Sequence, residues 1–155
     1  PFNAWLIARG AATLPIRMAA HARGAQAVAE WLETRETVTR VIYPGLPSHP
    51  QHALAQRQMT NASGMMAFQV GDAATGERLA QAMIDRFDFI HYAVSLGHQR
   101  TLIYWLGTDG MLGGAFKGSE SSMAAYRDWA GDGIFRLSVG LEDAADIIGD
   151  LARVL

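Results

Sequence analysis

The sequence predicts an α/β protein of the α+β kind, in which helices cover one face of a small, mainly antiparallel sheet. Short apolar segments with strand character are interleaved with segments whose apolar residues recur at helical spacing. No repeat, low-complexity tract or linker divides the 155 residues. Half of the residues are hydrophobic and 18% are charged, so we expect a packed core.

The chain is expected to begin with two helices. Asn3 is a candidate cap for a short helix that Gly10 ends. Thr13 is a candidate cap for a longer helix that runs to about Thr34, with a proline in its first turn, where the missing N–H costs nothing. The apolar stripe of this longer helix consists of Met18, Ala25, Val28, Ala29 and Leu32.

Strands and further helices follow, separated by a rigid proline-rich loop at residues 44–50. Apolar and β-branched segments predict strands at 38–43, 64–70, 89–94, 101–106 and 134–139. Helical spacing predicts helices at 51–59, 76–86 and 123–130. A last helix starts at Glu142 or Asp143 and has Arg153 in its last turn, which suits the helix dipole. The glycine-rich segment 107–122 has no clear period and is interpreted as a loop.

Composition limits the possible partners and compartments. The net charge of −2 argues against nucleic acid, whose phosphates need concentrated Lys and Arg. Without cysteine the chain has neither disulfides nor cysteine-bound zinc, and the reducing cytosol fits. No apolar run reaches the length of a transmembrane helix, and no signal-peptide pattern appears. We therefore expect a cytoplasmic protein with no nucleic-acid or membrane partner.

Arg136 is the most informative residue of the predicted strands. In segment 134–139 three apolar residues alternate with Ile134, Arg136 and Ser138, so the strand has two distinct faces. A guanidinium on a mostly apolar strand is costly unless it meets an anion. A local Asp or Glu could supply that anion, or a ligand carboxylate could bind there, assisted by a hydrogen bond from Ser95 at the end of another predicted strand.

The other motifs are weaker indications of a functional site. Gly113–Ser119 looks like a phosphate-binding loop but lacks the GxxxxGK[ST] spacing. His49 and His52 could share a helix face, yet no third ligand stands nearby, so no metal site is predicted. A nucleophilic role for Ser95 lacks a His-Asp pair to activate it.

Four motifs in register resemble one known family, and the resemblance covers nearly the whole chain. They are the P-F-N-A-W-L to T-L-P-I-R-M junction at 1–18 with His21, V-I-Y-P-G-L-P-S-H-P at 41–50, A-V-S-L-G at 93–97, and R-L-S-V-G-L-E-D at 136–143. Together they resemble the C-terminal part of the Cys/Met-metabolism pyridoxal-phosphate enzymes. This family includes methionine gamma-lyase, cystathionine gamma-synthase, cystathionine lyases and O-acetylhomoserine sulfhydrylase.

The resemblance implies a fold and a domain division. The family is similar to aspartate aminotransferase, in which a smaller C-terminal domain closes over the substrate. Residues 1–34 would then be connecting helices and residues 35–155 the substrate-closing domain. The domain that holds pyridoxal phosphate, with its covalently bound lysine, would lie upstream of Pro1. Lys117 is in the wrong context to replace that lysine, so we expect neither catalytic nor cofactor-binding residues in this chain, and no activity from it alone.

The resemblance also implies a substrate site. The arginine of the R-L-S-V-G motif, here Arg136, binds the α-carboxylate of the amino-acid substrate, and Ser95 and the backbone of Leu96 assist. Such capture aligns the substrate's Cα–H bond beside the cofactor ring. The resemblance implies that the parent enzyme uses pyridoxal phosphate and forms a homo-oligomer, a tetramer in the family's manner.

The implied activity belongs to sulfur amino-acid metabolism. A methionine gamma-lyase-like C–S lyase is the first hypothesis. A γ-replacement enzyme of the cystathionine gamma-synthase or O-acetylhomoserine sulfhydrylase type is an alternative, and a non-catalytic binding or oligomerisation module is another. After A-V-S-L-G the family usually continues through H-P-A-x-M-T-H, whereas residues 103–111 read I-Y-W-L-G-T-D-G-M and His98 precedes them. The accepted leaving group is therefore left open.

Overall fold

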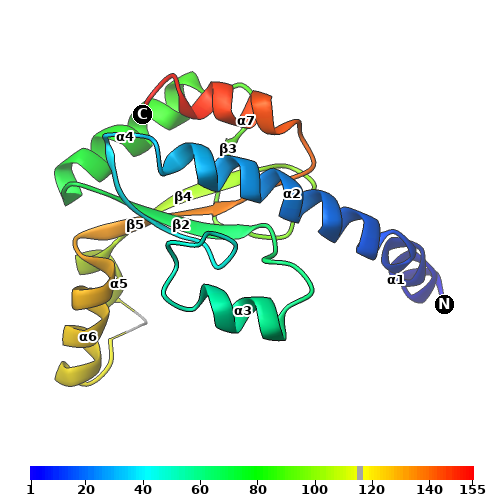
Figure 1. Ribbon diagram of the computed structural model, residues 1–155, viewed down its shortest axis with the longest axis horizontal. Helices are drawn as coiled ribbons and strands as arrows, with labels where there is room; N and C mark the ends of the chain where they lie inside the picture. The colour runs from blue at the N-terminus through cyan, green and yellow to red at the C-terminus, as the bar shows by residue number, and fades with distance from the viewer. Residues whose placement is uncertain (115–116) are drawn as a thin grey trace.

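In the computed structural model, which describes residues 1–114 and 117–155, the strands form a five-stranded sheet (Figure 1). The strands are β1 Val38–Ile42, β2 Met65–Val70, β3 His91–Tyr92, β4 Leu102–Gly107 and β5 Gly133–Ser138. Their spatial order is β1-β2-β5-β4-β3, and the β3–β4 pair is parallel while the other pairs are antiparallel. The predicted small, mainly antiparallel sheet is confirmed.

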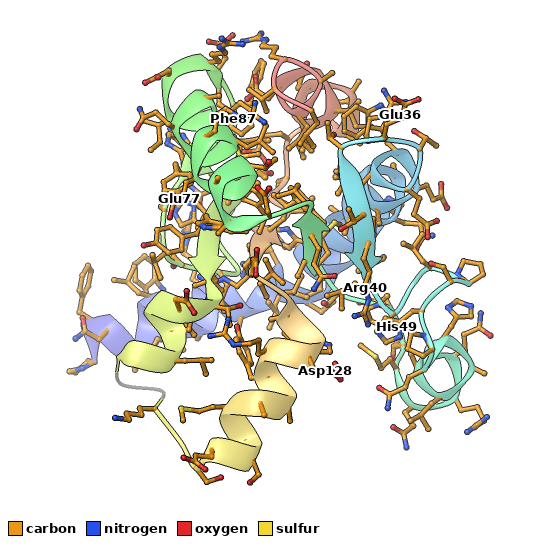
Figure 2. The ribbon with its side chains drawn as sticks, turned by 90° about the vertical axis from the view of Figure 1, so that its left-hand side faces the viewer. Glu36, Arg40, His49, Glu77, Phe87 and Asp128 are labelled. Carbon is orange, nitrogen blue, oxygen red and sulfur yellow. The ribbon has the colours of Figure 1, made fainter. Side chains whose placement is uncertain are left out.

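The helices lie on both sides of this sheet. They are α1 Phe2–Ala12, α2 Leu14–Leu32, α3 His52–Gln58, α4 Ala73–Arg86, α5 Thr108–Gly113, α6 Glu120–Ala130 and α7 Ala144–Leu151. Figure 1 shows α2, α4 and α7 covering one face, while α3, α5 and α6 lie on the other side. In Figure 2, Phe87 at the end of α4 lies on the covered side, and Asp128 of α6 and His49 before α3 lie opposite. The predicted helical cover of one face is therefore present.

The main core lies between the sheet and α2, α4 and α7. Phe135 of β5 is fully buried there, and its ring centroid lies 5.1 Å from that of Phe68 and 4.8 Å from that of Trp105. Gly76 lets α4 approach this cluster, because a Cβ there would lie 2.3 Å from the Trp105 ring. The aromatic cluster thus fixes the position of β5 within the sheet.

The opposite face of β5 is only partly covered. Ile134 packs with Ala67 and Ala130 in a smaller apolar cluster beside α6. Arg136, two residues further along the same face, is partly exposed, whereas its neighbours Phe135 and Leu137 are completely buried. The predicted two-faced character of this strand is confirmed, and it leaves the guanidinium on the face that the core helices do not cover.

The first helices differ from the prediction at their ends. Asn3 and Gly10 both lie inside α1, because the N–H of Trp5 already bonds to the carbonyl of Pro1 (3.0 Å) and closes the first turn. The predicted cap and the predicted end were therefore wrong. Thr13 precedes α2 as expected, but its hydroxyl donates back to the Gly10 carbonyl at 3.4 Å instead of capping α2. In the described part of the chain no helix is both long and apolar enough to span a membrane.

The interpretation of segment 107–122 as a loop was wrong for most of its length. Helix α5 occupies its start, α6 begins three residues before the predicted position, and residues 115–116 lie outside the described part. Contacts distant in sequence stabilise these helices: Arg127 pairs with Asp109 at 2.5 Å, and the Thr108 hydroxyl donates to the Gly131 carbonyl at 2.7 Å. Local periodicity could not reveal such contacts.

The predicted strand at 89–94 and the last helix were also too long. Strand β3 comprises only His91 and Tyr92, and the N–H groups of Phe89 and Ile90 just before them donate to the buried Asp150 carboxylate instead. Helix α7 ends at Leu151, and Arg153 beyond it forms an ion pair with Asp88 at 2.6 Å. Helix α4 starts three residues earlier than predicted, since the side chain of Asp72 caps it.

Candidate carboxylate-binding site

Arg136 lies in the middle of β5, between Ala67 of β2 and Tyr104 of β4. Residues that face each other across antiparallel strands share a side of the sheet, so these neighbours flank the guanidinium. One of its nitrogens (Nη2) donates to the carbonyl oxygen of Ser95 at 3.3 Å. The structure therefore brings Arg136 and Ser95 together, although 41 residues separate them.

Arg136 has no anionic partner among the described residues. The ion pairs found there join Arg127 to Asp109 and Arg153 to Asp88 and Asp150. Tyr92, whose ring packs against that of Tyr104, supplies no anion at neutral pH either, because burial raises its pKa above the usual value. The interpretation of Arg136 as a partner of a local Asp or Glu is thus not supported by the described residues.

The loop beside Arg136 offers two further hydrogen-bond donors. Ser95 and Leu96 are both exposed, and Leu96 has 59% of its surface accessible. Within the described part of the chain, neither the Ser95 hydroxyl nor the Leu96 N–H has a hydrogen-bond partner. A guanidinium, a hydroxyl and an amide N–H are the donors that a carboxylate accepts most readily.

This loop is fastened to the end of β5. Gly97 adopts φ +69°, a conformation that favours glycine, and its N–H donates to the Ser138 hydroxyl oxygen at 3.0 Å. Two residues later the Gln99 carbonyl accepts from Leu141 N–H at 2.8 Å. The donor-bearing residues Ser95 and Leu96 therefore lie directly before a segment that two hydrogen bonds fasten to the end of β5.

A second set of hydrogen bonds holds the backbone after β5. The Glu142 carboxylate accepts from both the N–H and the hydroxyl of Thr101, each at 2.8 Å. The Thr101 hydroxyl oxygen in turn accepts from Gly140 N–H at 2.8 Å. A Cβ on Gly140 would lie 2.5 Å from the carbonyl carbon of Arg100, so only glycine lets the two segments come this close.

His21 of α2 completes this support from the other side. Its ring is buried, and its Nδ1 lies 2.7 Å from the Val139 carbonyl and 3.0 Å from the Gly140 carbonyl. Because carbonyl oxygens only accept, Nδ1 must carry a hydrogen. His21 thus connects α2 to the backbone that follows β5.

The sequence pattern singled out Arg136 and Ser95, and the family resemblance added Leu96, but neither pointed to the residues that hold this loop. The position of Ser138, two residues after Arg136 on the same face, was the available signal for its proximity. No local pattern could pair Thr101 with Glu142, which are 41 residues apart.

The two histidines considered as metal ligands, His49 and His52, form other contacts. His52 Nδ1 lies 2.9 Å from the Pro44 carbonyl, and His49 Nδ1 accepts from Gln51 N–H at 3.2 Å. Partial burial, and then the charges of Arg40 and His52, lower the pKa of His49. The described residues contain no group of three or more His, Cys, Asp or Glu side chains that could hold a metal ion.

Comparison with known proteins agrees with the resemblance of the motifs. The family model of the Cys/Met metabolism PLP-dependent enzymes matches residues 1–155. The chain is 41% identical to O-succinylhomoserine sulfhydrylase of Pseudomonas aeruginosa, and the match covers 36% of that protein. It is 42% identical to L-methionine gamma-lyase of Porphyromonas gingivalis, and the match covers 37% of that protein. Both matches cover the whole of this chain.

A solved structure shares the fold. Cystathionine gamma-synthase from Xanthomonas oryzae pv. oryzae, in complex with cystathionine, superposes with a TM-score of 0.79 and 33% identity over 99% of this chain and 37% of that one. The chain thus spans a little more than a third of the length of the relatives that it matches. On these matches, the chain belongs to the Cys/Met-metabolism family of pyridoxal-phosphate-dependent enzymes.

Proposed function

We propose that this chain is the substrate-closing C-terminal part of a pyridoxal-phosphate-dependent enzyme of sulfur amino-acid metabolism, of the methionine gamma-lyase kind. Residues 1–34 connect it to the cofactor domain, and Arg136 binds the α-carboxylate of the amino-acid substrate with help from Ser95 and Leu96. The observation that carries the proposal is that Arg136 lacks any anionic partner in the described part of the chain while contacting Ser95.

The proposal assigns the cofactor to the rest of the enzyme, because the one lysine of this chain lies away from the candidate carboxylate site. Lys117, the one lysine of the sequence, is exposed and lies in the connection between α5 and α6. These helices join the sheet where Gly107 pairs with Gly133, whereas the Ser95 loop is fastened at the Ser138 end of β5. The amine is therefore not placed beside the candidate carboxylate site, and the cofactor is assigned to the rest of the enzyme, where it supplies the electron-withdrawing chemistry.

The contribution of this chain is orientation. Two parallel N–H···O bonds from a guanidinium to a carboxylate fix both the position and the plane of the bound group. The Ser95 hydroxyl and the Leu96 N–H would hold the same carboxylate from the loop side. With its carboxylate held, an amino acid has one way to present its Cα–H bond to the cofactor, which lowers the entropic cost of reaction.

The second candidate is a γ-replacement activity. Two of the matched relatives, O-succinylhomoserine sulfhydrylase and cystathionine gamma-synthase, carry names of this type. The two activities differ in their products: elimination releases ammonia and a keto acid, whereas replacement consumes a thiol and releases no ammonia. A panel of γ-substituted amino acids, assayed for ammonia with and without added thiol, separates them. A non-catalytic module would give neither product.

Carboxylate recognition can be tested with a substrate that lacks the charge. In the holoenzyme that contains this chain, we expect kcat/KM for L-methioninamide to be about 100-fold lower than for L-methionine, because the neutral amide cannot form the paired ionic hydrogen bonds. This ratio should fall towards 1 in Arg136→Ala. Equal kcat/KM values for the two compounds in the unmodified enzyme would contradict the proposal.

A further inference from the structure

We propose that Ser138 is a positioning residue of the carboxylate site, which holds the loop of Ser95 and Leu96 in its binding conformation. This inference rests on the proposed function of Arg136 and assigns to Ser138 a role that acts through the loop.

The hydrogen bonds form a closed path from β5 through the loop and back. The Ser138 hydroxyl oxygen accepts from Gly97 N–H at 3.0 Å, and the chain then leads back through Leu96 to Ser95. The Ser95 carbonyl accepts from Arg136 at 3.3 Å, which returns the path to β5 two residues before Ser138. One hydroxyl thus fixes a three-residue segment against the guanidinium that it is proposed to assist.

Ser138 is suited to hold the loop because it lies in a paired strand and is almost completely buried. Only 2% of its surface is exposed, and its strand is paired on both sides, with Met65 of β2 and Leu102 of β4. The loop by contrast is exposed from Val94 to Arg100. A hydrogen bond from an exposed loop to a fixed acceptor preorganises the donors of the loop, which reduces the entropic cost of ligand binding.

The fold itself depends little on this hydrogen bond. Gly97 is exposed, so water could satisfy its N–H if the hydroxyl were removed. The backbone of Ser138 would keep its ladder partners, and the Glu142–Thr101 contacts would still hold the segment that follows the loop. Loss of the hydroxyl should therefore affect the orientation of Ser95 and Leu96 more than stability.

The test uses the holoenzyme and butyrate, a carboxylate without an amino group that can bind but cannot react. In Ser138→Ala we expect the inhibition constant of butyrate and the KM for the amino-acid substrate to rise about 3- to 10-fold, as for loss of one neutral hydrogen bond, with kcat changed less than about 2-fold. Ser138→Thr, which keeps the hydroxyl, should bind butyrate as the unmodified enzyme does. Ser138→Val, which has the shape of Ser138→Thr but no hydroxyl, should bind butyrate as weakly as Ser138→Ala.

Thr108→Val is the matched control, since it removes another buried hydroxyl, at the start of α5 beyond the far end of β4, where it donates to the Gly131 carbonyl. It should lower the melting temperature and leave butyrate binding unchanged. If Arg136→Ala weakens butyrate binding but neither Ser138→Ala nor Ser138→Val does, the positioning role is wrong and the proposed function stands. If Arg136→Ala also leaves butyrate binding unchanged, the proposed carboxylate site itself is wrong.

Discussion

Replacing Arg136 with alanine should lower kcat/KM for the amino-acid substrate by about 30- to 1000-fold, or about 2–4 kcal/mol. The loss should raise KM strongly, because the guanidinium holds the carboxylate of the bound substrate, and should also lower kcat, because the same contact orients the Cα–H bond. The side chain lies between Ala67 and Tyr104, and its hydrogen-bond partner in the described part of the chain is the carbonyl of the exposed Ser95, which water can reach once the guanidinium is removed. Steady-state kinetics of the holoenzyme measure this effect.

Two variants make the Arg136 experiment specific. Arg136→Lys keeps the charge but loses the planar fork, so its kcat/KM should fall between the unmodified enzyme and Arg136→Ala. Arg40→Ala removes another arginine of the same sheet, exposed and in contact with a backbone carbonyl, that of Trp129 at 3.4 Å. Kinetics of Arg40→Ala should be unchanged, and an equal loss in both alanine variants would refute a specific role for Arg136.

Replacing Asp150 with alanine should lower the free energy of unfolding by about 3 kcal/mol. Its carboxylate is almost completely buried and accepts from three successive backbone N–H groups, at 2.7 Å from Phe89, 2.9 Å from Ile90 and 3.1 Å from Asp88. These hydrogen bonds connect α7 to the segment that leads into β3. Without them the buried Ile90 N–H in particular would have no acceptor.

The matched control is Asp146→Ala, which removes an exposed carboxylate from the same helix. Chemical denaturation should give nearly the same midpoint for Asp146→Ala as for the unmodified protein, and a clearly lower one for Asp150→Ala. Asp150→Asn, which keeps one acceptor oxygen, should fall between them. If Asp146→Ala and Asp150→Ala were equally stable, the buried carboxylate would not have the structural role assigned to it.

The fold and the position of Arg136 on the open face of the sheet could be predicted from local patterns, whereas its proposed carboxylate role came from the family resemblance. Alternation along β5 placed Arg136 and Phe135 on opposite faces, and the structure confirms this with one side chain partly exposed and the other fully buried. Apolar periodicity likewise located α2, whose stripe from Ala25 to Leu32 lies in the core. Such signals survive because a single face of one element carries them.

The parts of the structure that local patterns did not predict depend on contacts between residues far apart in the sequence. Helix α5 is bounded by glycines and has little periodicity, and it is tied to α6 through Asp109 and Arg127. The bond between Gly97 and Ser138 likewise joins residues 41 positions apart. Propensity describes a segment in isolation, so neither contact could be derived from its own neighbourhood.

The most direct test is a crystal structure of the holoenzyme that contains this chain, with an unreactive amino-acid analogue bound. The proposal predicts that both carboxylate oxygens of the analogue lie within about 3.2 Å of the Arg136 guanidinium nitrogens, with the Ser95 hydroxyl or the Leu96 N–H as a further donor. A bound analogue whose carboxylate contacts other residues, while Arg136 stays with the Ser95 carbonyl alone, would contradict it.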